Sequence, residues 1–384
     1  MASRTDRSTF SEWWWTVDRY LLFALIGLMV GGVVLSLAGS PAVAERLGLD
    51  SFHFAKRHIA FFLPAVAVMI AASFLTPRQV RRAAFIVFVT MTLLMVATLF
   101  VGEEIKGARR WISVGTFALQ PSEFVKPAFV VLVAWLFAES GRRTDIPGNL
   151  FAVLLLAIVG ALLVAQPDFG QTLLVVIAWA ALFFLSGVSW LWIGGIVAVG
   201  AAGVLLAYST MPHVADRVDR FLDPQGADTY QIDTALSSFL HGGWFGQGPG
   251  EGIVKRVLPD SHTDFIFAVA AEEFGIVVCI LLVLAFAYIV VRGLMLSLKD
   301  EDAFTRLAAA GLMILFGVQS VINMAVNLNL MPAKGMTLPF ISYGGSSLIA
   351  LGFQMGLLLA LTRRRHQPFQ ASGRLIYPAG QQAG

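Results

Sequence analysis

Charged residues are scarce in this chain, and their scarcity excludes a soluble globular enzyme. Asp, Glu, Lys and Arg make up 13% of the 384 residues, whereas hydrophobic residues make up 57%; soluble domains usually carry about 25% charged residues. Apolar runs recur at the length that a helix needs to cross the hydrocarbon core of a bilayer. The composition therefore predicts an integral membrane protein.

Cysteine is almost absent as well. The single Cys279 lies in an apolar run, which excludes an intramolecular disulfide, a thiol pair and a zinc-cysteine cluster. The net charge of +3 is too small and too dispersed for a nucleic-acid interface. The sequence also lacks His-Glu-x-x-His, Walker and Gly-x-Ser-x-Gly motifs. We therefore expect no nucleic-acid partner, no ATP hydrolysis and no zinc proteolysis.

The apolar runs predict an all-α polytopic fold of ten transmembrane helices over residues 20–362. One run is long enough for two helices joined by a turn at 186–189, and a further helix over 124–138 carries Lys126 as a snorkelling side chain. Residues 1–19, which show no cleavable leader, and residues 363–384 are expected to be tails. The charge-free runs are 20–44, 58–77, 83–102, 146–167, 169–215, which is the run long enough for two helices, 274–291, 307–333 and 335–362.

An even number of spans places both tails on one side of the membrane. The Lys and Arg residues of that side sit in short connections beside helix ends, so the positive-inside rule assigns it to the cytoplasm. The other side keeps twelve basic residues, which indicates that an anionic molecule is handled there. Its largest loop covers residues 209–264, and a polar segment of that length is usually functional or disordered.

The large outer loop has two recognisable parts. Residues 229–241 carry apolar side chains at helical spacing after a possible cap at Asp228, which predicts an amphipathic helix lying on the membrane or across the bundle. The alternating glycines of 246–252 follow no strand and predict a tight irregular loop rather than a dinucleotide site.

Asp264 lies where this loop meets the next apolar helix. One interpretation is a helix N-cap, although Thr263 can serve as the cap instead. The other is a general base, because a partly desolvated carboxylate at the membrane face suits deprotonation of a sugar or lipid hydroxyl. Glu272 and Glu273 follow inside the helix, where carboxylates are costly; they form either a structural pair in the bundle or part of the catalytic machinery.

A second polar cluster precedes the helix at 124–138. Arg109 and Arg110 beside Trp111 suit a phosphate held by forked donors, but Arg and Trp also anchor helices at membrane interfaces. Lys126, with Glu123 one turn earlier, is not explained by anchoring and indicates a polar cavity open to the outer side.

Two more segments interrupt the apolar pattern. Asp168 either joins the same cavity or caps the next helix. The prolines, glycines and hydroxyls of 331–347 predict re-entrant structure, because irregular backbone at membrane depth needs cover from protein or a water-filled cavity. Asn323, Asn327 and Asn329 are interpreted as interhelical hydrogen-bonding groups rather than ligands.

Five motifs, in the same order along the chain, resemble those of one known family. They are Arg-Arg-Trp-Ile at 109–112, Gln-Pro-Ser-Glu at 120–123, Pro-Asp-Phe-Gly at 167–170, His-Thr-Asp-Phe-Ile-Phe at 262–267 and Leu-Pro-Phe-Ile-Ser-Tyr-Gly-Gly-Ser-Ser at 338–347. The chain resembles the shape, elongation, division and sporulation (SEDS) family from its first apolar helix to its last, and is most similar to the cell-division branch. The resemblance implies a ten-helix peptidoglycan glycosyltransferase of the bacterial cytoplasmic membrane that polymerises lipid II on the outer face, at the division septum.

The resemblance also implies roles for individual residues. Asp264 matches the catalytic aspartate, and Arg109 with Trp111 matches required residues of the first large outer loop. No metal ligands are expected, although a divalent cation (Mg²⁺ or Mn²⁺) would suit a diphosphate leaving group. The expected substrate-binding residues are Lys106, Arg109, Arg110, Trp111, Gln120, Ser122, Glu123, Lys126, Asp168, His262, Thr263, Lys334 and Ser342.

The chain departs from the family pattern at two positions. Ala333-Lys334-Gly335 replaces a Pro-x-Thr-Gly sequence, and Arg256 stands where some members have a glutamate. A hydroxyl role at the first position and an acidic role at the second are therefore not transferred.

The absence of one motif predicts a partner protein. No lysine has a serine three residues before it, so the chain lacks the Ser-x-x-Lys nucleophile of penicillin-binding transpeptidases. We expect a separate single-span transpeptidase as partner, together with other division proteins. The competing hypotheses are a flippase or transporter for lipid II, an elongation-type polymerase and a noncatalytic scaffold.

Overall fold

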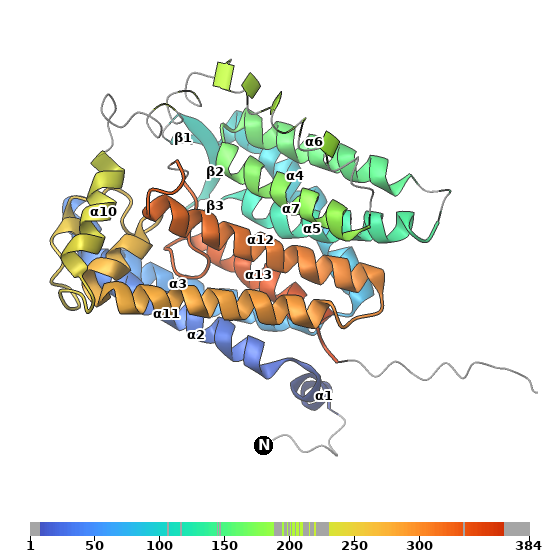
Figure 1. The fold of residues 1–384 in the computed structure, drawn as a ribbon, viewed down its shortest axis with the longest axis horizontal. Helices are drawn as coiled ribbons and strands as arrows, with labels where there is room; N and C mark the ends of the chain where they lie inside the picture. The colour runs from blue at the N-terminus through green and yellow to red at the C-terminus, as the bar shows by residue number, and fades with distance from the viewer. Residues whose placement is uncertain are drawn as a thin grey trace, which may run out of the picture.

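The structure, a computed structural model, is described for residues 8–364 except 106, 116, 144, 146, 333–334 and most of 188–229. Over these residues the chain forms a bundle of long apolar helices with a small sheet at one end (Figure 1). The helices are α1 (Thr9–Thr16), α2 (Arg19–Arg46), α3 (His53–Ser73), α4 (Pro77–Val101), α5 (Pro121–Ser140), α6 (Gly148–Ala165), α7 (Phe169–Leu185), α10 (Tyr230–Gly242), α11 (Ile266–Ser297), α12 (Ala303–Asn327) and α13 (Gly345–Leu361). The strands are β1 (Glu103–Ile105), β2 (Ala108–Val114) and β3 (Phe117–Leu119), and a 3₁₀ turn, η2, covers Val254–Arg256.

The two ends of the bundle differ in what they carry. The loop end holds the sheet, α10 and residues 328–344, and the terminus end holds α1, the start of α2 and the end of α13 (Figure 1). At the terminus end the N–H of Arg364 donates to the carbonyl of Thr16 at 3.0 Å. The chain therefore enters and leaves the bundle on the same side, as the even number of spans predicts.

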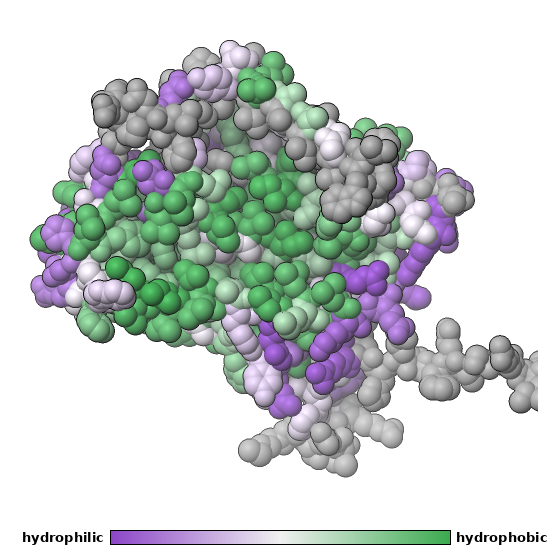
Figure 2. Space-filling view, viewed as in Figure 1, coloured by the Kyte–Doolittle hydropathy of each residue, from purple (hydrophilic) through white to green (hydrophobic). Residues whose placement is uncertain are grey.

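Most of the predicted spans are present as helices. Among the described residues, seven helices are long and apolar enough to cross a membrane, and α7 and α13 are shorter apolar helices. Figure 2 shows the matching surface, an apolar region with hydrophilic residues gathered toward its two ends. The tenth predicted span, after the turn at 186–189, lies outside the residues described.

The sheet corrects the all-α prediction. β2 pairs antiparallel with β1 on one side and with β3 on the other, directly before α5. Gly107 and Gly115 adopt φ values of 76° and 62° in the two turns, a backbone conformation that glycine adopts without steric cost. The strands are short and rich in charge, so the sequence shows no strand-like apolar alternation there.

An irregular segment precedes the last helix. The sequence predicts this interruption over 331–347, and α13 begins at Gly345. The described residues of 328–344 form no helix or strand; Met336, Leu338 and Phe340 among them are buried, whereas Leu328 and Leu330 are exposed. Irregular backbone covered by protein is what the prolines, glycines and hydroxyls of this segment predict.

The amphipathic helix of the large loop is confirmed as α10, within one residue at each end. Its buried residues are Thr234, Ala235, Ser238 and Gly242, and a Cβ at Gly242 would lie 1.9 Å from the carbonyl oxygen of Ala271 in α11. Leu240, a member of the predicted apolar stripe, is 84% exposed. Close approach of two backbones favours small side chains at the contact, so the packing face is rotated from the apolar stripe.

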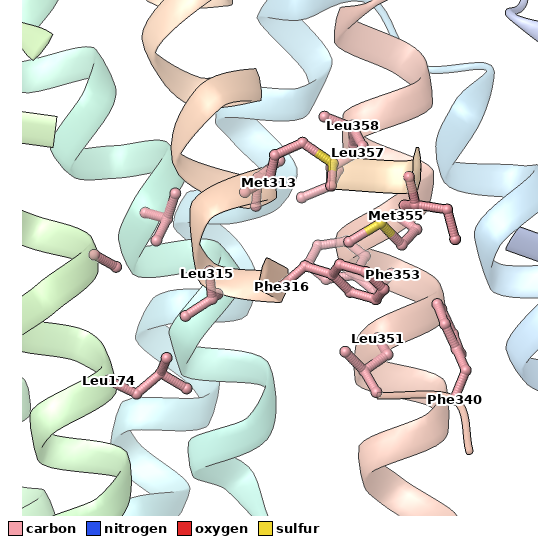
Figure 3. Close-up of a cluster of buried hydrophobic side chains, with 14 of the residues drawn as sticks. Leu174, Met313, Leu315, Phe316, Phe340, Leu351, Phe353, Met355, Leu357 and Leu358 are labelled. Atoms are coloured by element: carbon pink, nitrogen blue, oxygen red, sulfur yellow. The ribbon is translucent and has the colours of Figure 1, made fainter. Parts of the chain in front are cut away.

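Helices α5 and α12 lie at the centre of the bundle, and large side chains fill the space beside them. Figure 3 shows Phe316 of α12 facing Phe353 and Met355 of α13, with Phe340 of the irregular segment beneath them. Helices α3 and α13 approach so closely that a Cβ at Gly352 would lie 2.4 Å from the carbonyl oxygen of Ala65. This central packing fixes the helices whose loop ends carry the site.

Candidate active site

Asp264 lies in a turn directly before α11 at the loop end. Its backbone carbonyl accepts hydrogen bonds from the side-chain amides of Asn323 and Asn327, both at 2.9 Å. The N-cap position of α11 is Phe265, which makes no side-chain cap bond. The geometry thus does not put Asp264 in the N-cap position, and α12 fixes its backbone.

The sequence predicts that Asn323 and Asn327 form hydrogen bonds between α12 and neighbouring segments. Asn323 donates to the carbonyl of Met336 at 2.6 Å, and the side-chain oxygen of Asn327 accepts the N–H of Ala268 at 3.1 Å. Both amides therefore join α12 to the two segments that flank it. For these two residues the interhelical interpretation is confirmed.

The irregular segment before α13 forms the wall opposite Asp264. The hydroxyl of Ser342 donates to the carbonyl of Thr263 at 2.6 Å and accepts the N–H of Leu338 at 2.7 Å. A Cβ built on Gly335 would lie 3.4 Å from an Asp264 carboxylate oxygen. The carboxylate therefore lies beside the backbone of this segment.

An aromatic wall adjoins the same turn. The rings of His262 and Phe54 of α3 are tilted, with centroids 4.4 Å apart, and the centroid of His262 lies 5.6 Å from that of Tyr343. The N–H of Tyr343 donates to the carbonyl of His262 at 3.0 Å.

Lys126 lies in a closed polar cluster among α5, α7 and α12. Its ammonium donates to Glu123 at 3.0 Å, to Gln171 at 2.7 Å and to Gln319 at 3.5 Å. Both Lys126 and Glu123 are nearly fully buried. The predicted cavity residues thus come together, but their charges are satisfied within the protein.

This cluster reaches the irregular segment through one of its amides. The side-chain nitrogen of Gln319 donates to the carbonyl of Thr337 at 3.1 Å. Gln319, Asn323 and Asn327 are spaced four residues apart, so they share one side of α12. A single face of α12 therefore joins the Lys126 cluster to Asp264.

The two arginines before α5 separate in the structure. The guanidinium of Arg110 donates to the carbonyls of Gln166 and Pro167 and lies 3.6 Å from Asp168. Arg109 is on the opposite face of β2, where its side chain is 47% exposed and lies 3.4 Å from Glu104. The two guanidinium groups therefore do not converge on one point.

Asp168 combines its two predicted roles. It accepts the N–H of Gln171 at the start of α7 and pairs with Arg110. Burial raises its pKa, and Arg110 opposes that effect. The residue both caps α7 and closes the end of the polar cluster.

The other predicted residues occupy varied positions at the loop end. Trp111 is half-buried on β2, and the backbone N–H of Gln120 donates to the hydroxyl of Ser346 at 3.2 Å. Ser122 is buried at the start of α5. Lys106 and Lys334 lie outside the described residues.

Glu272 and Glu273 are structural in this geometry. Glu272 accepts the backbone N–H of Val254 and Glu273 accepts that of Gly252, and Glu273 also pairs with Lys255. Among the described residues no group of three or more His, Cys, Asp or Glu side chains is placed to hold a metal ion.

Gln171 and Gln319 were missed by the sequence interpretation. Amide side chains in apolar helices are uncommon, and the spacing of Gln319 with Asn323 and Asn327 is the signal that identifies the shared face. Gln171 carries no such periodic signal, because its partners come from other helices.

Comparison with known proteins matches this arrangement to one family. The sequence profile of the FtsW, RodA and SpoVE cell cycle proteins matches residues 19–367. The "Probable peptidoglycan glycosyltransferase FtsW" of Caulobacter vibrioides is 50% identical over 97% of this chain and 95% of its own length. The protein of the same name from Aliivibrio salmonicida is 35% identical over 90% and 88%.

Solved structures show the same fold. A chain from a peptidoglycan synthase complex, whose structure is described as coordinating polymerization and crosslinking, superposes with a TM-score of 0.76 at 28% identity, covering 92% of this chain and 99% of its own. The rod shape determining protein RodA of Thermus thermophilus gives 0.69 at 27% identity with the same coverage. This chain belongs to the FtsW, RodA and SpoVE family of cell cycle proteins.

Proposed function

We propose that the chain is a peptidoglycan glycosyltransferase that polymerises lipid II for the cell wall during division, with Asp264 as general base. The observation that carries the proposal is the carboxylate of Asp264 at the loop end, on a backbone fixed by two α12 amides and beside Gly335. The FtsW names of the relatives support the division role over the elongation role.

The reaction needs one base and a stabilised leaving group. Asp264 takes the proton of an acceptor sugar 4-hydroxyl as its oxygen bonds to the anomeric carbon of the donor. The bond between that carbon and the lipid diphosphate breaks, and the diphosphate leaves with the electron pair. A phosphate leaving group needs no separate general acid, which distinguishes this site from a two-carboxylate glycosidase.

The charge that develops on the diphosphate requires basic groups at the loop end. Arg110 and Lys126 already pair within the protein, so their role is to hold α5, α7 and β2 in place. Arg109 is the exposed candidate for diphosphate contact, with Lys106 and Lys334 as further candidates from the sequence. Trp111, Gln120, Ser122, His262, Thr263 and Ser342 line the same end. A divalent cation would add charge stabilisation, but no step here depends on one.

The topology that fits this chemistry has the loop end outside and both tails, 1–19 and 363–384, in the cytoplasm of a bacterium. α7 begins at the loop end beside Arg110, while α10 lies at that same end. A tenth span within 188–229 is therefore consistent with ten crossings over residues 20–362 and an outer loop at 209–264.

Cysteine labelling tests that topology. In a Cys279→Ser background, a cysteine replacing the exposed Glu251 is expected to react with an impermeant maleimide in intact spheroplasts. One replacing Arg78, exposed at the terminus end, is expected to react only after lysis. The reverse pattern would place the site in the cytoplasm and exclude the mechanism.

Polymerisation of purified lipid II in detergent tests the activity itself. An enzyme gives glycan product without any membrane to cross, whereas a flippase or a scaffold gives none. The polar clusters lie toward one end of the bundle, and a flippase needs ligands near the midplane that open to both sides. The absence of product from the folded wild-type chain would therefore overturn the proposal.

The proposed partner is a single-span penicillin-binding transpeptidase, with other division proteins at the septum. The missing Ser-x-x-Lys motif supports it, as does the solved peptidoglycan synthase complex that contains a chain of similar fold. Co-purification with the transpeptidase encoded in the same genome is the test.

A further inference from the structure

Helix α11 is broken at Gly275, and the glycine-rich loop completes its hydrogen bonds. Gly275 has φ 81° and ψ 175° inside the helix, so the backbone bonds of that turn cannot form within α11. The loop after α10 replaces them with bonds of 2.9–3.3 Å. They run from the N–H groups of Gln247 and Gly248 to the carbonyls of Glu272 and Glu273, and from the N–H groups of Ile276 and Val277 to the carbonyls of Gly243 and Trp244.

The two backbones are too close for side chains at the contact. A Cβ at Gly246 would lie 2.2 Å from the carbonyl oxygen of Glu273, and one at Gly275 would lie 2.3 Å from that of Trp244. Gly246 and Gly275 also have positive φ values of 80° and 81°. Glycine is therefore required here both for space and for backbone conformation.

The side chains of the same turn hold the next part of the loop. Glu272 accepts the N–H groups of Val254 and Lys255 at 2.7 and 2.8 Å. Glu273 accepts those of Gly250 and Gly252, and the ammonium of Lys255. All three ionisable side chains are at most 2% exposed.

Lys255 extends this contact to a third element. Its ammonium also donates to the carbonyl of Ala38 in α2 at 3.1 Å. α2 contains Pro41, and a proline inside a helix disturbs the carbonyls one turn before it. Lys255 thereby joins α2, α11 and the loop.

The anchored loop leads directly to the proposed catalytic residue. Only eight residues separate Lys255 from Asp264, and among them Leu258 and Ser261 are fully buried. Asn323 and Asn327 fix the far end of this stretch. The backbone that carries Asp264 is thus held at both ends.

We infer that Lys255, Glu272 and Glu273 are positioning residues that set the location of Asp264 during glycan polymerisation. The inference rests on the proposed function. The three side chains act through the backbone of residues 250–264 and touch no reacting atom. Their loss should lower kcat and leave KM, which reports uniform substrate binding, almost unchanged.

The test combines kinetics with local hydrogen exchange. The double variant Lys255→Met/Glu273→Gln neutralises the pair without leaving one buried charge alone. We expect kcat for lipid II polymerisation to fall at least tenfold, KM to stay within about twofold and amide exchange in 250–264 to accelerate at least tenfold. Asp18→Asn/Arg292→Met, which neutralises a pair at the terminus end of the same helix, should change none of these.

Two results would overturn the inference. One is wild-type kcat in the double variant, and the other is a lower kcat with unchanged exchange in 250–264. If the double variant does not fold, Glu272→Gln is measured by the same two criteria. A wild-type chain that fails to polymerise lipid II removes the proposed function instead, while the exchange result still decides whether the three residues anchor the loop.

Discussion

Most helices that begin at the two ends of the bundle differ in whether a side chain caps their first turn. At the terminus end, α1, α2, α4 and α12 begin with side-chain caps from Ser8, Asp18, Thr76 and Asp302. At the loop end, α3, α5, α11 and α13 begin without one. Local sequence thus fixes most helix starts at one end, and tertiary contacts fix most of them at the other.

Among the described residues, the almost fully buried ion pairs lie at the loop end, where exposed pairs such as Arg109–Glu104 also occur. The pairs Arg142–Asp302 and Arg292–Asp18 at the terminus end are partly exposed. Lys126–Glu123 and Lys255–Glu273 at the loop end are almost fully buried. Buried charges are costly unless every partner is in place, so they fix one arrangement without adding much stability. The loop end is therefore organised for position, which a catalytic site needs.

The largest expected effect is on chemistry at the loop end. Asp264→Asn should lower the polymerisation rate by about 10²–10⁴-fold, the usual contribution of a positioned general base. Its melting temperature should stay near that of the wild type, because the backbone bonds to Asn323 and Asn327 do not involve the carboxylate. The assay is polymerisation of purified lipid II, with Asp233→Asn on the exposed face of α10 as the matched control. Retention of more than about a tenth of the rate, a loss below ~1.4 kcal/mol, would remove Asp264 as the base.

The buried pair of α5 should give the largest effect on stability. Lys126→Met leaves Glu123 buried without its cation, which costs about 3–5 kcal/mol, whereas Arg142→Met at the terminus end should cost less than about 1 kcal/mol. Thermal unfolding in detergent measures both. Adding Glu123→Gln to Lys126→Met should recover much of the loss; no recovery would mean that the charge imbalance is not the cause.

The contrast between the two ends shows which features of the structure can be predicted from the sequence and which cannot. The apolar runs predict the helices well, since lipid leaves a helix as almost the only option for a spanning segment. They do not reveal the sheet at 103–119, whose pairing depends on tertiary position. At the site, the sequence identifies Asp264 and the Glu123–Lys126 spacing, but not the separation of Arg109 from Arg110. Alternation along β2 decides that separation, and the strand itself was not predicted.

Substitution of Asn323 should have a smaller effect and tests whether the position of Asp264 affects the rate of polymerisation. Asn323→Leu removes the donor to the carbonyls of Asp264 and Met336 and should cost about 1–3 kcal/mol of stability. It should also lower kcat per folded molecule several-fold, because the Asp264 turn loses one anchor. Gln354→Leu is the control, since Gln354 donates to the carbonyl of Leu312 within the bundle. It should lose comparable stability and keep its kcat; equal kcat in both variants would count against a positioning role for Asn323.

The smallest effect is expected at a terminus-end cap, where charge and capping can be separated. Burial alone would raise the pKa of Asp302, but hydrogen bonds from Thr305 and Arg142 outweigh it and lower the pKa. The folded chain therefore binds the proton less tightly than the unfolded chain, so this stabilisation is present above the unfolded pKa, about 3.9, and is lost as the pH falls through the folded value. Asp302→Ala should cost about 1 kcal/mol at neutral pH, whereas Asp302→Asn, which still caps α12, should cost only a few tenths. Melting temperatures between pH 3 and pH 7 check this, because the Asp302 contribution to the acid dependence should disappear in both variants while polymerisation at neutral pH stays unchanged. A variant at this end that lowers polymerisation without lowering stability would show that the two ends are not separate in function.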